Sequence, residues 1–243
     1  QLLGSQNDMA TIRLRVILWT AVLAVMGWMS YGIWRGEAAA ALERSRAGEV
    51  SAPEEAVKEQ KLIALTFDDG PHPVYTPMLL DGLKERNVKA SFFLLGGNIE
   101  GNEEVVERMA EEGHLIGNHT YSHVQLTKIS PEEAEREISG TNEKILAASG
   151  VLPRYIRPPY GEWSEQLEAM TAMEPVFWNV DPQDWKVLDR KAVADHIIKH
   201  GADGAVVLLH DSYETTVEAA LEVIDTLEKQ GYTFVTVDEL LVD

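Results

Sequence analysis

Short apolar segments alternate with longer amphipathic segments along most of this chain, and that alternation limits the folds that it can adopt. Seven apolar segments have the character of strands, at residues 61–67, 90–95, 114–119, 154–159, 175–180, 204–210 and 232–237. Helical patterns of about ten or more residues lie between them, at 76–87, 102–113, 131–150, 164–173, 189–200 and 215–230. Such alternation is typical of βαβ units that build a parallel sheet. The pattern predicts an α/β domain over residues 61–243 with about seven parallel strands, arranged as a barrel or as an open doubly wound sheet.

A long uncharged stretch precedes this domain. Residues 16–34 carry no charged side chain, and a bilayer span takes about 20 residues. Arg13 and Arg15 come before the stretch. Basic residues that flank a membrane span stay in the cytoplasm, so we expect the rest of the chain to lie outside it. A cleaved signal peptide, which would release a secreted protein, is the alternative, because small residues follow at 38–41. We predict four regions: a leader and cytoplasmic tail (1–15), a single transmembrane anchor (16–35), a solvated stalk (36–60) and an extracellular domain (61–243).

The composition excludes one kind of partner and one kind of ligand. The chain has 40 acidic and 21 basic residues, for a net charge of -19, whereas a nucleic-acid partner requires a basic surface. There is no cysteine, so a metal ion can be held only by histidine and carboxylate side chains. We therefore expect no nucleic-acid partner and no thiolate metal site.

Polar side chains concentrate where the predicted strands end. They follow the first, third, fourth, fifth and sixth strands, as Asp68 and Asp69, His119, Arg157, Asp181 and Asp184, and His210 and Asp211. The carboxyl ends of parallel strands in an α/β barrel lie on one face, where active sites are built. This distribution predicts that the side chains share one site.

The motif HTYSH places His119 and His123 four residues apart. On a helical turn this spacing would direct both imidazoles to one point, as metal ligation requires. A third ligand oxygen would leave a position open for water, which is typical of a catalytic site. Two hydrogen-bonded loop histidines are the alternative interpretation.

The motif TFDDG places Asp68 and Asp69 at the end of the first strand. Neighbouring residues that leave a strand point in opposite directions, so one carboxylate could bind a metal ion while the other takes a proton from water. A turn or helix cap is the alternative, since DDGP is common turn chemistry.

Three further motifs carry candidate site residues. RPPYG holds Arg157 on a rigid segment, where it could orient a carboxylate or make only a surface salt bridge. DPQDW places Asp184 beside Trp185, whose indole could support a sugar ring or pack in the core. LLHD places His210 after an apolar strand, where it could be structural or, paired with a carboxylate, a general acid.

Together the motifs TFDDG, HTYSH, RPPYG, DPQDW and LLHD, in this order, resemble carbohydrate esterase family 4, the NodB-homology polysaccharide deacetylases. The resemblance extends over about residues 61–243. It implies a distorted (β/α) barrel and the metal-dependent removal of N-acetyl groups from an acetylated glycan, either peptidoglycan or a chitin-like polymer. Zn²⁺ is the expected ion, and Co²⁺ and Ni²⁺ are alternatives.

The resemblance also implies roles for the residues that activate water. Asp68 is similar to the general base of the family, and Arg157 to the residue that orients it. Asp69, His119 and His123 resemble the three metal ligands.

The remaining roles concern the oxyanion, the leaving group and the glycan. The backbone N–H of Tyr160 resembles the oxyanion donor. His210 resembles the general acid that protonates the leaving amine, and Asp184 the carboxylate that tunes it. Trp185 and Leu208 are similar to the groove wall and to the pocket for the acetyl methyl group.

Other functions stay open at this point. The resemblance also permits an O-acetyl esterase acting on xylan. A non-catalytic cell-wall glycan-binding module is a different class, although the presence of both Asp68 and His210 argues against it. A serine hydrolase lacks support because the chain has no G-x-S-x-G motif.

Overall fold

The computed structural model describes Met26 and residues 60–241, and the helices and strands named below lie between residues 61 and 240. The chain divides into two units, residues 1–58 and 59–243, and this architecture belongs to the second unit. The predicted anchor over 16–35 and stalk over 36–60 lie outside the described residues, apart from Met26 and Gln60. Among the helices that the structure describes, none combines the length and apolar character that crossing a bilayer requires.

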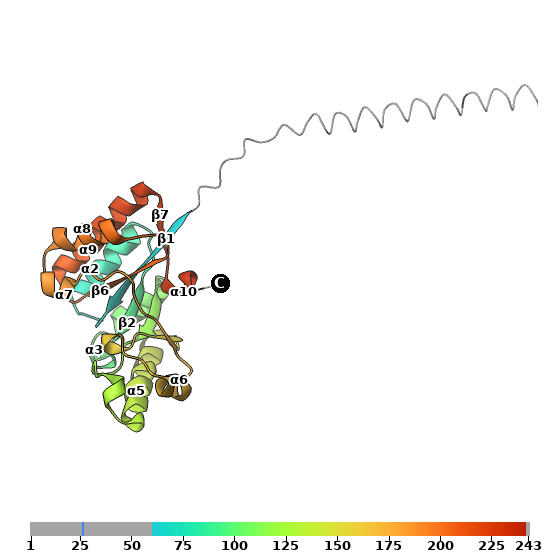
Figure 1. Cartoon of the computed structure of the whole chain (residues 1–243), viewed down its shortest axis with the longest axis vertical. Coiled ribbons are helices and arrows are strands. Elements are labelled where there is room, and N and C mark those ends of the chain that lie inside the picture. The colour runs from blue at the N-terminus through green and yellow to red at the C-terminus, as the bar shows by residue number, and fades with distance from the viewer. Residues whose placement is uncertain (1–25, 27–59, 242–243) are drawn as a thin grey trace, which may run out of the picture. The chain divides into compact units, whose positions relative to one another are not determined.

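Seven parallel strands form the sheet, as the sequence predicts (Figure 1). They are β1 (Lys61–Asp68), β2 (Ser91–Leu94), β3 (Leu115–Asn118), β4 (Tyr155–Ile156), β5 (Glu174–Pro175), β6 (Ala205–His210) and β7 (Tyr232–Phe234). Their order is β5-β4-β3-β2-β1-β6, and β7 pairs with β1. Asp68 and His210 are paired in register at the carboxyl ends of β1 and β6, so the sheet itself brings these two residues together.

The segment after β5 connects the two ends of the strand row. Val180 forms a parallel bridge with Val207 of β6, and the N–H of Leu208 donates to the Val180 carbonyl at 2.9 Å. Since β5 and β6 are the outermost strands of the row, this bridge brings its ends together. The arrangement is consistent with a distorted (β/α) barrel, in which the irregular seam lies between β5 and β6.

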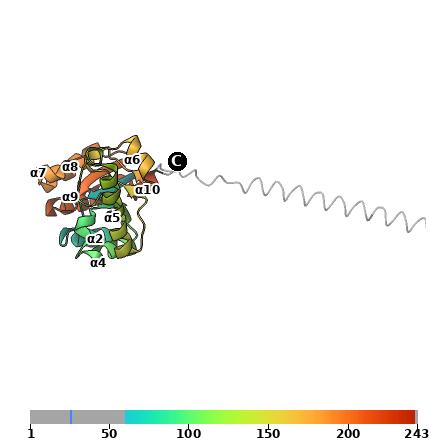
Figure 2. The same ribbon diagram turned by 90° about the horizontal axis from the view of Figure 1, so that it is seen from below.

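Helices cover the outside of the sheet (Figures 1 and 2). The longer ones are α2 (Tyr75–Glu85), α4 (Glu103–Glu111), α5 (Pro131–Ser149), α6 (Glu165–Met170), α8 (Arg190–His200) and α9 (Glu214–Leu227). Short helices are α3 (Gly96–Ile99), α7 (Asp184–Val187) and α10 (Val237–Leu240), with 3-10 turns η1 (Leu126–Lys128), η2 (Pro159–Gly161) and η3 (Glu228–Gln230). Helix α9 packs against α2 and α8, whereas α5 packs against α3 and α4.

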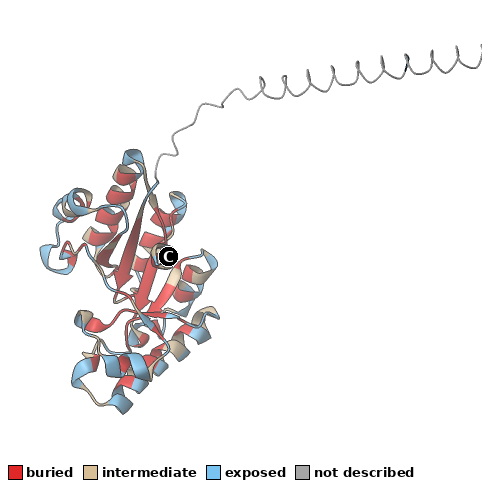
Figure 3. Cartoon of the chain, turned by 45° about the vertical axis from the view of Figure 1, so that its right-hand side comes forward, coloured by how far each residue is buried: buried red, intermediate tan, exposed pale blue. Residues whose placement is uncertain are grey.

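Burial on both faces of the sheet fixes the strands rigidly. Six consecutive residues of β1, from Ile63 to Asp68, are buried, as expected for a strand covered by helices. Phe67 and Phe92 stack with ring centroids 5.4 Å apart. Figure 3 shows buried residues along the strands and the inward faces of the helices. Each fully buried Leu, Ile or Phe contributes about 1.5–3 kcal/mol, so the strand ends form a stable base for a site.

Three predicted strands have the wrong extent. The fourth strand was expected over 154–159 and the fifth over 175–180, but β4 covers only Tyr155–Ile156 and β5 ends at Pro175. The N–H of Val176 still donates to the Ile156 carbonyl at 2.8 Å, and the segment then bridges β6 at Val180. The last strand was expected over 232–237, but β7 ends at Phe234. There Thr236 and Glu239 form a capping box that starts α10, a local signal within the sequence TVDE.

Candidate metal centre and catalytic cleft

A cleft of about 440 Å³ lies at the carboxyl ends of the strands. Its lining residues are Asp68, Asp69, His119, His123, Pro158, Tyr160, Trp178, Asp181, Trp185, Leu208, His210 and Tyr213. Arg157 and Asp184 lie fully buried behind this wall, where they bind Asp68 and His210 respectively. The structure therefore brings together all ten residues that the family resemblance assigns to the site.

The two histidines of HTYSH lie in a loop, so the predicted helical turn is wrong. Residues 119–123 come between β3 and η1. Thr120 and His123 have φ angles of 69° and 59°, which a right-handed helix excludes. The imidazoles of His119 and His123 nevertheless lie close, with ring centroids 4.9 Å apart and an interplanar angle of 68°. The loop conformation, rather than helical spacing, brings the two rings together.

His119 is held in the tautomer that suits metal ligation. Its Nδ1 lies 2.6 Å from the carbonyl oxygen of Arg157, which can only accept, so Nδ1 carries the proton and Nε2 has a free lone pair. Burial lowers the pKa of His119 below its ordinary value, although the charges of Asp68 and Asp69 oppose this effect. A neutral imidazole with Nε2 directed into the cleft follows.

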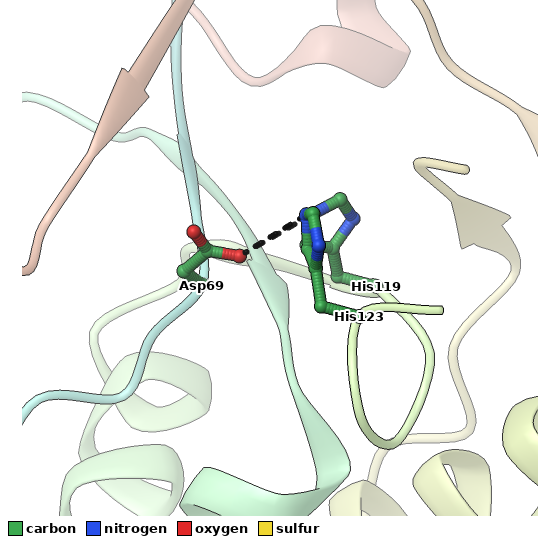
Figure 4. Close-up of side chains that lie close together, drawn as sticks. All are labelled: Asp69, His119 and His123. Atoms are coloured by element: carbon green, nitrogen blue, oxygen red, sulfur yellow. Dashed lines mark ion pairs between the residues drawn. The ribbon is translucent and has the colours of Figure 1, made fainter. Parts of the chain in front are cut away.

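Asp69 supplies an oxygen that no protein donor satisfies. Its Oδ1 is buried and has no hydrogen-bond partner within the described part of the chain. This atom lies 3.5 Å from His119 Nε2 and 3.7 Å from His123 Nε2 (Figure 4). The three ligand atoms lie within 4.8 Å of one another. An anionic oxygen facing two imidazole nitrogens fits a divalent cation such as Zn²⁺, Co²⁺ or Ni²⁺.

The backbone turns sharply at Asp69, whose φ is 69°. The strand pattern predicted that the two aspartates point in opposite directions, and this prediction is wrong, because both approach His119. Asp68 Oδ2 lies 3.8 Å from His119 Nε2, close to the imidazole that Asp69 also approaches. The other oxygen of Asp68 faces away from the metal centre.

That second oxygen forms a buried ion pair. Arg157 Nη1 donates to Asp68 Oδ1 at 2.9 Å and to Thr66 Oγ1 at 2.5 Å. The guanidinium carbon lies 4.3 Å from the centre of the Phe93 ring, and Arg157 has no exposed surface. A charge buried this deeply is stable only when it is paired, so the pair fixes one oxygen of Asp68 and leaves the other at the cleft.

Asp184 and His210 form a second pair on the far side of the cleft. Asp184 Oδ1 lies 2.9 Å from His210 Nδ1, while Asp184 Oδ2 accepts from the N–H of His210 and from Thr216 Oγ1. Burial lowers the pKa of His210, but the hydrogen bond and the negative charge of Asp184 outweigh burial and raise this pKa to about 9. His210 is therefore a protonated imidazolium at neutral pH.

The other predicted residues form the walls. Tyr160 lies within η2 with φ 64°, and its ring is packed edge-on against His123 with centroids 4.9 Å apart. Trp185 is 50% exposed on α7, as a platform for a ligand would be, and Leu208 is buried on β6.

Sequence reasoning did not assign cleft roles to Trp178 and Tyr213. Trp178 lies in the segment that was expected to be strand, and its ring also lies 5.6 Å from the Arg157 guanidinium carbon. Tyr213 follows LLHD by two residues and carries no motif of its own. Only the aromatic type, frequent in sugar-binding sites, could have indicated either residue.

Fold and site together define a parallel α/β protein whose cleft combines an Asp-His-His cation site with two buried charged pairs. Among known proteins, the polysaccharide deacetylase family matches residues 55–174. The chain is 42% identical over 193 residues to peptidoglycan-N-acetylmuramic acid deacetylase PdaC of Bacillus subtilis, covering 79% of this chain and 41% of PdaC. It is also 42% identical over 185 residues to a peptidoglycan-N-acetylglucosamine deacetylase of Bacillus cereus, covering 73% of this chain and 67% of that protein.

Solved structures agree with these relatives. The structure of PdaC matches with a TM-score of 0.73 at 43% identity, covering 75% of this chain and 91% of the solved chain. A family 4 acetyl xylan esterase from Clostridium thermocellum in complex with a cobalt ion matches with a TM-score of 0.71 at 36% identity, covering 74% and 90%. The chain belongs to the polysaccharide deacetylase family, which confirms the resemblance seen in its motifs. It spans about two fifths of the length of PdaC.

Proposed function

We propose that this chain is a metal-dependent hydrolase that removes N-acetyl groups from an aminosugar polysaccharide, either peptidoglycan or a chitin-like glycan, and releases acetate. One observation carries the proposal: a cation site, a buried carboxylate and an imidazolium line the same cleft. Acetamide hydrolysis needs a polarised carbonyl, an activated water and a protonated leaving amine. The three groups correspond to these three requirements.

Asp69, His119 and His123 would hold the ion, for which Zn²⁺ is our first candidate and Co²⁺ and Ni²⁺ are alternatives. A bound divalent ion supplies Lewis acidity, which polarises the acetyl carbonyl and lowers the pKa of water. Asp68 takes a proton from the attacking water, and Arg157 keeps its carboxylate in position through the 2.9 Å hydrogen bond. The N–H of Tyr160 donates to the carbonyl oxygen as negative charge develops, a contribution of about 3–4 kcal/mol for one donor.

His210 acts on the leaving group, because an amine leaves only after its nitrogen is protonated. Asp184 keeps this imidazole protonated below about pH 9. Because Nδ1 is hydrogen-bonded to Asp184, the proton that His210 donates to the amine comes from Nε2. Trp185 offers its exposed indole to the sugar ring, and Leu208 contacts the acetyl methyl group. After the C–N bond breaks, the amine and acetate dissociate. His210, now neutral, regains a proton from solvent, and Asp68 releases to solvent the proton that it took from water.

Acetate release tests the proposal. We expect Zn²⁺-loaded protein to release acetate from N-acetylglucosamine oligosaccharides or purified peptidoglycan, to stop when a chelator is added, and to recover with Zn²⁺. Asp68→Asn removes the base and should lower kcat by about 100-fold or more, with glycan binding retained. Zn²⁺-loaded, folded protein that releases no acetate from either glycan would contradict the proposal.

An O-acetyl esterase acting on xylan is the second candidate, because an acetyl xylan esterase shares this fold with a TM-score of 0.71. An alkoxide leaves with less help from an acid than an amine does, so the raised pKa of His210 favours the amide reaction. Rates on acetylxylan and on N-acetylglucosamine oligosaccharides separate the two activities, and a higher kcat/KM on acetylxylan would favour the esterase. If the chain is instead a glycan-binding module without turnover, the wild type and Asp68→Asn should bind the glycan equally, and neither should release acetate.

We also propose that the chain is tethered to the cell membrane with this domain outside the cytoplasm. The support is the uncharged stretch 16–34, preceded by Arg13 and Arg15. Fractionation of cells that make the whole chain, followed by protease treatment of intact cells, tests the location. A soluble, secreted product whose N-terminus follows residues 38–41 would show instead that a signal peptide is removed.

A further inference from the structure

The loop that carries two of the metal ligands is bound from outside the cleft by one glutamate. Glu137, half-buried on α5, accepts three hydrogen bonds: from the N–H of Tyr121 at 2.9 Å, from the N–H of Ser122 at 2.8 Å and from Ser122 Oγ at 2.8 Å. Its side chain is not part of the cleft wall. Glu137 therefore contacts the backbone between His119 and His123 without contacting either imidazole.

The opposite edge of the loop is bound by a different element. The N–H groups of Gly96 and Gly97, at the start of α3, donate to the carbonyls of Thr120 and Tyr121 at 3.0 and 2.9 Å. A side chain at Gly96 would place its Cβ 2.6 Å from the Tyr121 ring, so only glycine permits this close approach. Helix α3 thus binds the carbonyls of the loop, and Glu137 binds its amides.

The loop needs such support because its backbone is unfavourable. Thr120 and His123 both lie in the left-handed region, at φ 69° and 59°, which non-glycine residues rarely adopt. Such conformations persist only where the surrounding structure imposes them. A carboxylate that accepts two adjacent N–H groups makes charge-assisted hydrogen bonds, which are stronger than neutral ones. Glu137 is the charged group that makes these contacts.

We propose that Glu137 is a positioning residue for the metal centre: through the amides of Tyr121 and Ser122 it holds the loop so that His123 converges with His119 and Asp69. This inference rests on the proposed function only through the cation site. It also gives Ser122 a role, since its hydroxyl donates to the same carboxylate.

Cobalt binding measures this role without turnover. Metal-free wild type, Glu137→Ala, Glu137→Gln and Ser122→Ala are titrated with Co²⁺ and followed by visible absorption and calorimetry. Loss of a residue that orients metal ligands typically costs about 10–100-fold in metal affinity, and we expect a loss of this size for Glu137→Ala. Glu137→Gln, which keeps an acceptor oxygen, and Ser122→Ala, which removes one of three bonds, should lose less.

Glu143→Ala is the matched control, because Glu143 is exposed on the same helix. It should bind Co²⁺ like the wild type. Urea unfolding of the metal-free variants separates positioning from folding: a lower unfolding midpoint with unchanged Co²⁺ affinity and spectrum in Glu137→Ala would overturn the inference. Wild type that fails to bind Co²⁺, with His123→Ala indistinguishable from it, would overturn the cation site and the proposed function as well.

Discussion

The Asp184 carboxylate determines both the position and the protonation of His210. It binds the Nδ1 and the N–H of this residue, and its hydrogen bond and charge, with the charges of Asp68 and Asp69, raise the pKa of His210 to about 9 in spite of burial. Asp184→Asn keeps the shape but removes the charge that contributes most to raising this pKa, so the pKa of His210 should fall. NMR titration of the His210 ring measures the pKa, and the alkaline limb of the kcat profile should move to lower pH with it.

This pair also makes folding stability depend on pH. The pKa of His210 is about 9 in the folded chain, higher than about 6.5 in an unfolded one. Its contribution is therefore complete below about pH 6.5 and is lost as pH rises towards 9. The free energy of unfolding of wild type should exceed that of Asp184→Asn most at the acid end of this range. Asp181→Asn, three residues earlier in the chain, is the control and should keep the pH dependence of the wild type. The same loss of stability in Asp181→Asn as in Asp184→Asn would show that the effect does not come from the Asp184–His210 pair.

Arg157 stabilises the fold as well as the base. It is fully buried and paired with Asp68, so Arg157→Met leaves a buried carboxylate without its partner. Removing one partner of a buried pair costs about 3–5 kcal/mol, and urea unfolding should show a loss of this size. The double variant Arg157→Met with Asp68→Asn should regain part of it. A double variant no more stable than Arg157→Met would show that lost packing, against Phe93 for example, causes the effect.

The residue types of the site could be predicted from sequence, but their local conformations could not. Asp68 and His210 end apolar strands and His119 directly follows one, and that pattern is visible in the sequence. The left-handed backbone at Asp69 and His123 is not visible, because it depends on contacts with α3, α5 and the neighbouring strands. Helical spacing therefore gave the wrong conformation for the HTYSH motif although the two imidazoles do converge.

At the scale of elements, α5 is fixed by local sequence. Ser130 and Glu133 form a capping box, Pro131 takes the first helical position, and Gly150 ends the helix in the left-handed region at φ 73°. Ser130→Ala should lower the free energy of unfolding by about 1 kcal/mol, and Ser130→Gly by only a few tenths. Chemical denaturation measures both variants. Because Glu137 lies beyond the first turn, Co²⁺ affinity should not change, and a tenfold loss in Ser130→Ala would contradict this separation.

Elements with their own periodicity were predictable, and elements defined by pairing were not. Helices α2, α4, α5, α8 and α9 and strands β1, β2, β3 and β6 lie close to their predicted ranges. Strands β4 and β5 have two residues each. Prolines at 153, 158 and 159 flank β4, whereas Pro175 lies within β5, whose bonds to β4 come from the N–H groups of Glu174 and Val176. The bridge between Val180 and Val207 joins segments that are distant in sequence, and nothing local in either segment indicates it.

At the scale of the whole molecule, the net charge of the chain and the carboxylates of the cleft both disfavour an anionic glycan. The chain carries a net charge of -19. The cleft wall contains the carboxylates of Asp68, Asp69 and Asp181, and its described lining includes no lysine or arginine. Arg157 lies behind the wall but is already bound to Asp68. A glycan that bears carboxylates is therefore repelled at a distance, and the cationic side chain in the described lining, His210, is already paired with Asp184, whereas a neutral glycan experiences no such repulsion.

Ionic strength should therefore separate neutral from anionic substrates. The Debye length falls from about 30 Å at 0.01 M salt to about 8 Å at 0.15 M, so added salt screens the repulsion of a carboxylate-bearing peptidoglycan fragment. We expect kcat/KM for that fragment to rise about tenfold over this range, within the range of electrostatic effects on association. For a neutral N-acetylglucosamine oligosaccharide it should change by less than about twofold. Acetate release by Zn²⁺-loaded protein at fixed pH, with each substrate well below its KM, measures both values. Equal salt dependence for the two glycans would show that salt acts on the protein itself, because charge repulsion can change only the anionic substrate.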